Sequence, residues 1–330
     1  MNVILTVSSP PHIFGRDTVR RRMRDVLIAL SPAAIAAIYV YGTHVLSVMA
    51  VAMASAAGAE FIFRKVTGKK NTIADMSALI TGLLVAFNLP PAAPLWLAAV
   101  GGAFAIVVVK QLFGGLGQNF LNPALAARAF LLASFPTYMT NWAPRPDFDG
   151  VAEPTLLAVA RATENFVPRA GLYAELLFHK VGGTIGEVSA LALIAGGVYL
   201  LVRRVINWRI PVFYIGSFAL FAFVLGREAF FSGDVLFEVL SGGLLLGAFF
   251  MATDYATSPI SPGGKVIMGI GCGFLTVLIR FYGGYPEGVS YAILLMNLLV
   301  PVIDRHVRPR VYGKARGRPR AKAKVMEEKA

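Results

Sequence analysis

Apolar residues along this chain occur in long uncharged runs, and short clusters of Lys and Arg separate these runs. Runs of this length are typical of membrane-spanning helices. Because backbone polar groups need internal partners within a bilayer, we expect the runs to be helical. The predicted fold class is therefore an all-α polytopic membrane protein with about ten transmembrane helices. The predicted spans cover residues 26–43, 45–63, 77–89, 94–111, 123–135, 187–202, 210–226, 235–253, 265–281 and 288–303.

The stretch over residues 112–136 carries the strongest local signal. It begins with a glycine-rich turn, in which the backbone can take a positive φ or approach a ligand closely. Asn122 and the proline after it are typical of the N-cap and first position of a helix. That helix, over 123–135, is too short to cross about 30 Å of hydrocarbon. Half-length helices after polar loops are where membrane proteins tend to bind ligands and ions.

A weaker copy of this pattern lies near the C-terminus, where Gly283 and Gly284 precede an apolar helix that we expect to end at Pro301. The copies divide the spans into two groups of five. Since five is odd, the second group runs opposite to the first, which predicts two inverted five-helix repeats with short or broken helices near their interface. The expected organisation is a cytoplasmic segment 1–24, a first membrane repeat 25–135, an extracytoplasmic segment 136–186, a second membrane repeat 187–303 and a basic cytoplasmic tail 304–330.

Composition and charge support the membrane interpretation. The chain is 56% hydrophobic and only 15% charged. Its net charge of +13 comes with 24 of the 31 Lys and Arg residues at span ends and in a C-terminal tail that we place inside, which is the positive-inside pattern rather than a nucleic-acid surface. Both termini are therefore predicted to be cytoplasmic. The one cysteine, Cys272, excludes an intrachain disulfide, and the four histidines show no metal-ligand spacing.

Four groups of motifs occur in a specific order. They are DMSALITGLL at 75–84 with NLPP at 88–91, KQLFGGLGQN at 110–119 with NPA at 122–124, DYATSP at 254–259, and GGYPEGVSYAILLMN at 283–297. With these motifs the chain resembles the RnfD family, the D subunits of Rnf electron-transport complexes, over residues 20–305. It is similar, more distantly, to the NqrB family of the sodium-pumping NADH:quinone reductases.

The resemblance implies a non-autonomous subunit of an ion-translocating ferredoxin:NAD oxidoreductase in the bacterial cytoplasmic (inner) membrane. Its complex would pass electrons between ferredoxin and NAD and move Na⁺ or H⁺. The implied partners are the A, B, C, E and G subunits of the Rnf complex and a flavin transferase. The resemblance implies no catalytic residue in this chain but an FMN joined by a phosphoester to a threonine on the outer face.

The family's attachment pattern is an Asp, two residues, and then Ser/Thr-Gly-Ala-Thr. Asp149 and Thr155 keep this spacing, which singles out Thr155 as the covalent FMN candidate. The intervening residues are Ala-Glu-Pro instead. Pro154 fixes φ and removes an N–H group, and Glu153 adds a negative charge where a diphosphate must approach. The alternative is that Thr155 is only the N-cap of a helix that begins at residue 156.

Other polar residues are candidates for a second, noncovalent flavin such as riboflavin, or for an ion. The cofactor-binding candidates are Gly114, Gly115, Gly117, Asn119, Asn122 and Arg128. For the glycine loop the alternative is a tight turn that satisfies its own backbone. We expect Arg128 to pair with a carboxylate or hold a flavin phosphate, because a charge inside a span is costly. Asp75 and Asp254 are candidates for the ion path, or for helix caps, and Arg280 is expected to snorkel outward.

Two other classes of function remain open from the sequence. Inverted repeats with half-length helices also suit a secondary transporter without a redox group. The second class is a structural subunit whose flavin site has decayed. The altered residues before Thr155 keep this alternative open.

Overall fold

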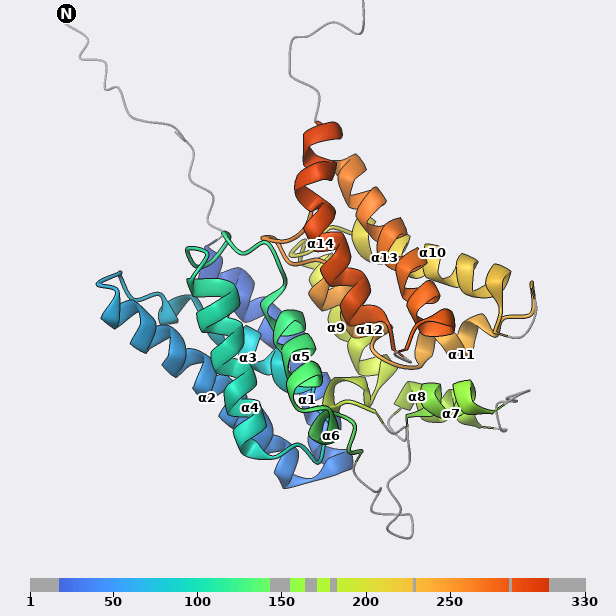
Figure 1. The fold of residues 1–330 in the computed structure, drawn as a ribbon, viewed down its shortest axis with the longest axis horizontal. Coiled ribbons are helices and arrows are strands. Elements are labelled where there is room, and N and C mark those ends of the chain that lie inside the picture. Colours follow the sequence, from blue (N-terminus) through green and yellow to red (C-terminus); the bar gives the residue numbers. More distant parts are fainter. Residues whose placement is uncertain are drawn as a thin grey trace, which may run out of the picture.

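The computed structural model describes residues 18–142, 155–163, 171–178, 183–227, 230–284 and 287–308. These residues form helices and no strand, as the apolar pattern predicted (Figure 1). Within these ranges, four helices are long and apolar enough to cross a membrane: α1 (Val19–Tyr41), α2 (Thr43–Val66), α13 (Pro262–Tyr282) and α14 (Val289–His306). The shorter apolar helices are α3 (Ser77–Phe87), α4 (Leu95–Phe104), α5 (Pro123–Ser134), α9 (Ala190–Val202) and α10 (Arg209–Leu225). The protein is therefore a helical membrane protein.

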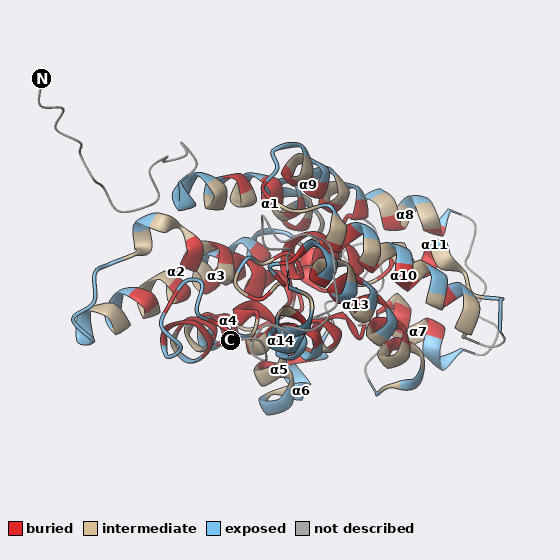
Figure 2. Ribbon diagram, turned by 90° about the horizontal axis from the view of Figure 1, so that it is seen from above, coloured by how far each residue is buried: buried red, intermediate tan, exposed pale blue. Residues whose placement is uncertain are grey.

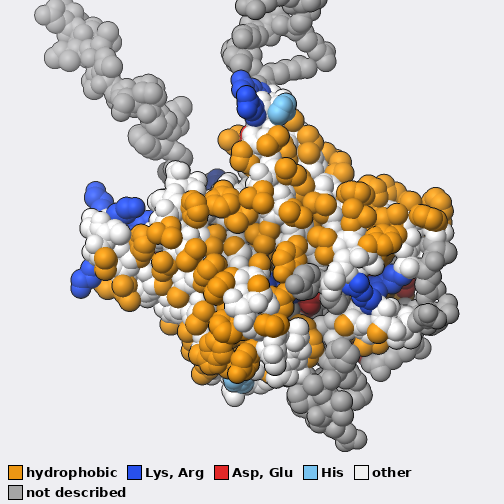
Figure 3. Space-filling view, in the orientation of Figure 1, with side chains coloured by type: hydrophobic (Ala, Val, Ile, Leu, Met, Phe, Trp, Pro, Cys, Tyr) orange, Lys and Arg blue, Asp and Glu red, His pale blue; other side chains and the backbone are white. Residues whose placement is uncertain are grey.

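The outer faces of these helices are apolar. Tyr39, Ile35 and Ile62 are 78%, 66% and 62% exposed, although water disfavours such surfaces. Buried residues gather in the middle of the bundle in Figure 2, and hydrophobic side chains cover much of the face in Figure 3. A hydrocarbon environment removes the cost of this exposed apolar surface.

Two prolines lie inside the long helices. Pro32 in α1 cannot donate to the carbonyl of Ile28, and the Ser31 hydroxyl donates to that carbonyl instead, at 2.8 Å. Side chains commonly satisfy backbone groups that proline leaves free in membrane helices. Pro301 lies within α14, which continues to His306. The prediction that this helix ends at Pro301 is therefore wrong.

Helices pack in the same pattern within the first and the second part of the chain. In the first, α2 packs against α3 and α4, and α4 packs against α5. In the second, α10 packs against α11 (Val235–Leu240) and α13, and α13 packs against α14. Between the two parts, α1 packs against α9 and α5 packs against α14.

Several elements are irregular. The α4 helix continues as a π-helical segment, η2 (Ala105–Gln111). The region over 235–253, which we expected to be one span, is divided into α11, the short α12 (Leu244–Leu246) and the π-helical η4 (Gly247–Met251). The break falls at Ser241, Gly242 and Gly243, and Gly242 has a φ of 69° that favours glycine.

Short elements complete the chain. The 3-10 turn η1 (Ile73–Asp75) precedes α3, and α6 (Pro136–Met139) follows α5 directly. On the other side of the gap at 143–154 lie α7 (Leu156–Ala162), α8 (Leu172–Phe178) and the 3-10 turn η3 (Ile185–Glu187). The α7 and α8 helices form a small apolar cluster with α11, separate from the main core. This cluster carries Thr155 at its edge.

Candidate functional site

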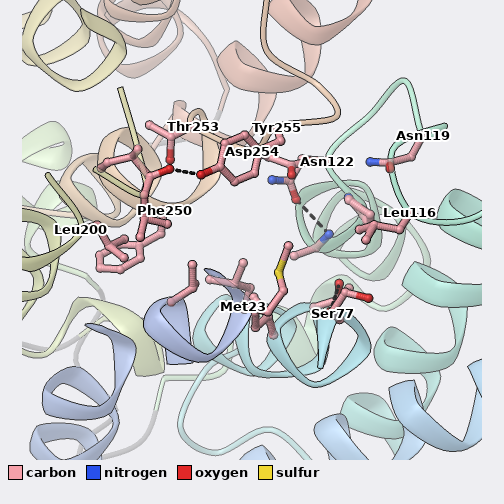
Figure 4. Close-up of a pocket in the computed structure, with 18 of the residues that line it drawn as sticks. Met23, Ser77, Leu116, Asn119, Asn122, Leu200, Phe250, Thr253, Asp254 and Tyr255 are labelled. Atoms are coloured by element: carbon pink, nitrogen blue, oxygen red, sulfur yellow. Dashed lines mark hydrogen bonds between the residues drawn. The ribbon is translucent and has the colours of Figure 1, made fainter. Parts of the chain in front are cut away.

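A cavity of about 100 Å³ lies between helices from the first and second parts of the chain (Figure 4). We call it the inner cavity, because it is lined by Ser77, Lys110 and Leu200, which lie at span ends that the sequence predicts to face inside. Its polar lining comprises Ser77, Thr81, Lys110, Asn119, Asn122, Thr253 and Asp254. Its apolar and aromatic lining includes Leu116, Phe249, Phe250 and Tyr255. Mostly apolar walls with a few polar groups are typical of small-molecule and cofactor sites.

Asn122 joins the two parts of the chain at this cavity. Its Oδ1 accepts from the backbone N of Ala124 at 3.0 Å, which confirms the predicted N-cap of α5. Its Nδ2 donates to the carbonyl of Met251 at 3.1 Å, and its backbone N donates to Asn297 Oδ1 at 3.1 Å. One asparagine therefore fixes the start of α5 against both η4 and α14.

The glycine-rich turn lies beside this cavity. Gly114, Gly115 and Gly117 have φ values of 119°, 101° and 85°, so positive φ is the one of the two expected reasons for glycine that the structure shows. A Cβ on Gly115 would lie 2.7 Å from a terminal nitrogen of Arg64, so the turn packs against the end of α2. Asn119 lines the cavity, and its Nδ2 donates to the carbonyl of Leu121 at 3.0 Å.

The two carboxylates proposed for the ion path occupy different places. Asp254 lines the inner cavity and accepts from the Thr257 hydroxyl at 3.2 Å. Asp75 accepts from the backbone N and the hydroxyl of Ser77, at 2.8 and 2.6 Å. Asp75 therefore stabilises the start of α3, and it touches the cavity only through Ser77.

A buried ion pair that the sequence analysis missed lies beside the inner cavity. Glu60 is fully buried in α2, and its Oε2 lies 2.8 Å from Lys110 Nζ. The ammonium also donates to the Ser77 hydroxyl at 2.6 Å, and the Thr72 hydroxyl donates to Glu60. A lone carboxylate within the second apolar run was the available signal, because intramembrane acids are seldom without function.

A second cavity of about 80 Å³, the outer cavity, contains Arg128. Arg128 donates to Asn88 Oδ1 at 3.0 Å and forms an ion pair with Glu287. Asn88 Nδ2 in turn donates to the carbonyl of Leu84 at 2.6 Å, at the end of the half-length helix α3. Of the two roles considered for Arg128, the structure shows the pairing with a carboxylate. Arg128 lines the outer cavity, whereas Asn119 and Asn122 line the inner cavity, so these three candidates do not share one site.

Thr155 lies at the start of α7. Its Oγ1 accepts from the backbone N of Ala158 at 3.3 Å, so the predicted N-cap is confirmed. The residue is 6% exposed, and Leu157 behind it packs in the small cluster with α8 and α11. Asp149 and the Ala-Glu-Pro sequence before Thr155 lie outside the described residues. Arg161 is exposed in the last turn of α7.

Tyr173 connects α8 to the membrane part of the chain. Its hydroxyl donates to Asp234 Oδ2 at 2.5 Å, just before α11. This hydrogen bond is the main cause that raises the pKa of the Tyr173 phenol above its usual value. The α8 helix is therefore held to α11 by a polar contact as well as by apolar packing.

Arg280 is not at an exposed edge, so the expectation that it snorkels outward is wrong. Its side chain is fully buried, and it donates to the carbonyl and the carboxylate of Glu238 at 2.6 and 2.9 Å. The guanidinium also lies 4.8 Å from the centre of the Phe218 ring. Burial is possible because Glu238 supplies the opposite charge.

The sequence of this chain matches the NQR2, RnfD, RnfE family over residues 6–313. It is 49% identical over 319 residues to the D subunit of the Na⁺-translocating ferredoxin:NAD⁺ oxidoreductase complex of Acetobacterium woodii, covering 97% of this chain and 98% of that protein. It is 40% identical over 322 residues to the D subunit of the proton-translocating complex of Clostridium ljungdahlii, covering 95% and 97%. The D subunit of an ion-translocating oxidoreductase complex of Stutzerimonas stutzeri is 40% identical over 343 residues, covering 94% and 96%. The chain belongs to the NQR2, RnfD, RnfE family.

Proposed function

We propose that this chain is the D subunit of an ion-translocating ferredoxin:NAD⁺ oxidoreductase complex, and that it acts as a redox carrier in the bacterial inner membrane. Relatives with that name align with it over nearly their whole length. The structural observation that carries the proposal is the inner cavity, where Asn119 and Asn122 meet Asp254. Electrons would arrive from and leave to partner subunits, for which the proposed set is A, B, C, E and G.

The proposal includes ten spans in two inverted repeats, with both termini cytoplasmic. The shared packing pattern supports it, since the second, third, fourth and fifth elements of each part pack alike. Contacts between the parts also join equivalent elements, α1 with α9 and α5 with α14. An approximate two-fold axis in the membrane plane produces such pairs and places sites at the repeat interface.

The covalent group is proposed to be FMN on Thr155, attached by a flavin transferase. The residue fits a phosphoester, because its oxygen acts as a hydrogen-bond acceptor toward Ala158 N and keeps that capacity when the hydroxyl proton is replaced. FMN supplies the electron chemistry when bound. The chain contributes a short helix that fixes the attachment atom at the outer face.

Access to Thr155 requires that α7 moves away from its cluster, since the residue is 6% exposed. The main apolar contact to be broken is that of Leu157. Burying one leucine contributes about 1.5–3 kcal/mol, so lifting α7 is a modest cost for a folding subunit.

The inner cavity is proposed to hold the second, noncovalent flavin. Phe249 and Phe250 provide flat apolar surface, and Asn119 and Asp254 provide polar groups for the edge of a ring system. Asp254 lines the same cavity, and Asp75 reaches it through Ser77. These two carboxylates connect the cavity to the proposed ion path. If complexes with both carboxylates neutralised pump normally, those two residues are excluded from the path.

In-gel flavin fluorescence after denaturing electrophoresis tests the proposal, with peptide mass mapping of the band. We expect a fluorescent band with FMN on Thr155, and loss of the adduct in Thr155→Ala. Thr163→Ala is the matched control, because Thr163 is exposed at the other end of α7 and should leave fluorescence unchanged. A dark band from protein expressed with its native transferase would contradict the redox-carrier function.

A secondary transporter without a redox group is the second candidate. The observation that favours it is the presence of an inner and an outer cavity with only a thin layer between them. Asn88 of the outer cavity lies 3.9 Å from the sulfur of Met251, whose carbonyl accepts from Asn122 of the inner cavity. Covalent flavin in the purified protein would exclude this candidate, and a dark, transport-competent protein would support it.

A further inference from the structure

Three polar side chains form a continuous run of hydrogen bonds from the start of α3 to the inner cavity, which we call the polar run. The Asp75 carboxylate accepts from the Ser77 hydroxyl at 2.6 Å. The Ser77 oxygen in turn accepts from Lys110 Nζ at 2.6 Å. Asp75 is half-buried, whereas Ser77 and Lys110 are 5% and 2% exposed and both line the cavity. The polar run therefore connects the predicted inside face with the cavity.

The backbone is irregular at both ends of the polar run. Lys110 lies in the π-helical segment η2, and π-helical segments within α-helices are frequent at functional sites. Met76, between Asp75 and Ser77, has a φ of 64°, a left-handed conformation that is uncommon for residues other than glycine. Backbone strain of this kind also clusters at functional sites. The two irregular positions are therefore where a functional role of the polar run would place them.

The Lys110 ammonium has a donor to spare for a ligand in the cavity. A lysine ammonium carries three N–H donors. Within the described residues, two of them go to Glu60 Oε2 at 2.8 Å and to the Ser77 hydroxyl at 2.6 Å. The third is left for a group in the cavity that Lys110 lines.

The surroundings of Glu60 allow Lys110 to lose a proton. Glu60 is fully buried, and a buried carboxylate without a partner is costly. Lys110 is not its one partner: Arg64 Nε lies 3.8 Å from Glu60 Oε1, and the Thr72 hydroxyl donates to the same carboxylate. Glu60 therefore keeps a cation and a hydrogen bond when Lys110 becomes a neutral amine.

One acid is joined to the polar run at its exposed end. Asp254 lines the same cavity and is also half-buried, but it accepts from the Thr257 hydroxyl. Asp75 is therefore the acid that can collect a proton from water and pass it to Ser77. The charged groups on the described elements around Lys110 are Glu60 and Arg64 of α2, Asp75 of η1, Asp254 after η4, and Arg128 of α5, which lines the outer cavity.

We propose that Ser77 and Lys110 relay protons from Asp75 at the inside face to the noncovalent flavin proposed for the inner cavity. This proposal deepens the proposed function and rests on it. Electrons come through partner subunits from reduced ferredoxin, which is oxidised. A flavin that accepts two electrons also takes up at least one proton.

The relay supplies that proton in balanced steps. An N–H bond of the Lys110 ammonium breaks as a bond to the same proton forms on the ring, and Lys110 becomes a neutral amine. Ser77 then gives its hydroxyl proton to the amine and receives one from Asp75, which takes its replacement from water. The net transfer is one proton from the inside medium to the cavity, and reoxidation returns it by the same route.

The test follows proton uptake while the purified whole complex is reduced. The complex is mixed rapidly with reduced ferredoxin in weakly buffered solution that contains a pH-indicator dye, and flavin absorbance and dye signal are recorded together. Acid precipitation of separate samples measures the noncovalent flavin released per complex, which reports binding without turnover. We expect Ser77→Ala to keep its noncovalent flavin and to show one phase of proton uptake that is at least tenfold slower than in the wild type.

Two further variants separate a relay from a structural role. Ser77→Thr should restore the fast phase, because it keeps the hydroxyl. Lys110→Met combined with Glu60→Gln removes the final donor while the buried charges stay balanced, so it should be as slow as Ser77→Ala.

The pH profile identifies the entry residue. Asp75→Asn should be slow at alkaline pH and become faster as the pH falls, because water then delivers protons to Ser77 directly. Ser77→Ala should stay slow at every pH. Ser217→Ala is the matched control: it makes the same change at a buried hydroxyl in α10, which donates to the carbonyl of Tyr214 at 3.2 Å, and it should leave the fast phase unchanged.

Normal proton uptake in Ser77→Ala and in the double variant, with normal flavin content, would overturn the relay and leave the proposed function intact. Loss of the noncovalent flavin from Ser77→Ala would also overturn the relay, because Ser77 would then hold the ligand instead. A wild-type complex that releases no noncovalent flavin would overturn the proposed inner flavin and the relay together.

Discussion

Replacing Arg128 should destabilise the protein more than replacing its ion-pair partner Glu287. Arg128→Met removes the guanidinium that interacts with both Glu287 and the nearby Glu187. Glu287→Gln instead leaves Arg128 with Glu187 in electrostatic range and with Asn88 Oδ1 at 3.0 Å. Arg128→Met should cost more, because it removes the one guanidinium that interacts with both Glu287 and Glu187, whereas Glu287→Gln removes only one of the two carboxylates.

The expected loss of folding free energy follows from how deeply the ion pair is buried. Removing one member of a buried pair costs about 3–5 kcal/mol. The two side chains are 13% and 11% exposed, so we reduce the expected cost of Arg128→Met to about 2–4 kcal/mol, roughly a 30- to 700-fold change in the folding equilibrium. For Glu287→Gln we expect about 1–2 kcal/mol, because the remaining acid partly replaces the lost one.

The assay is heating of the detergent-purified protein, followed by fluorescence-detected size exclusion of what remains folded. Arg203→Met is the matched control: Arg203 also lies 3.2 Å from a carboxylate, that of Asp25, but its side chain is 40% exposed. Water reaches the guanidinium of this pair although Asp25 is only 7% exposed, so we expect a smaller cost than at Arg128, about 1 kcal/mol. Equal midpoints for Arg128→Met and Arg203→Met, or a larger loss for Glu287→Gln than for Arg128→Met, would refute the reasoning.

Two more predictions concern other polar contacts. Lys110→Met should lower the yield of folded protein sharply, because it leaves the fully buried Glu60 without its closest cation. Combining Lys110→Met with Glu60→Gln should recover much of that yield. A double variant that folds no better than Lys110→Met would contradict this account. Raising the pH through the elevated pKa of the Tyr173 phenol should loosen α8. A group whose pKa is raised in the folded state stabilises the fold below its unfolded pKa and loses that effect as the pH rises. Protease cleavage near α8 should therefore increase at high pH in the wild type, and Tyr173→Phe, which has lost the Asp234 bond at every pH, should show no such increase.

Local signals in the sequence predicted local structure well. Asn122 before a proline marks the start of α5, and Asn88 before Leu-Pro-Pro marks the end of α3. The cap at Thr155 followed from the apolar pattern after it. Each of these features depends on residues within one helical turn, so a single sequence contains the needed information.

Features that depend on distant partners could not be predicted in this way. Arg280 was expected at the surface because Glu238, which holds it inside, lies 42 residues away on α11. The helix that passes through Pro301 was expected to end there, because proline ends most helices in water, whereas surrounding groups compensate for it in a membrane bundle. The count of ten spans and the repeat remain predictions.

The breaks in the helices explain why the candidate sites lie where they do. A helix that stops within the membrane leaves backbone groups without partners, and hydrocarbon cannot supply them. Polar side chains from the other part of the chain supply them instead: the carbonyl of Met251 receives Asn122 from 129 residues away, and the backbone N of Asn122 reaches Asn297, 175 residues away. These side chains must be buried and polar, and they must lie between the two parts. A space lined by such groups can hold a charged or polar ligand that the surrounding lipid would exclude. The same requirement therefore produces both the irregular backbone and the two cavities, which is why the polar candidates from the sequence lie at or beside the broken elements.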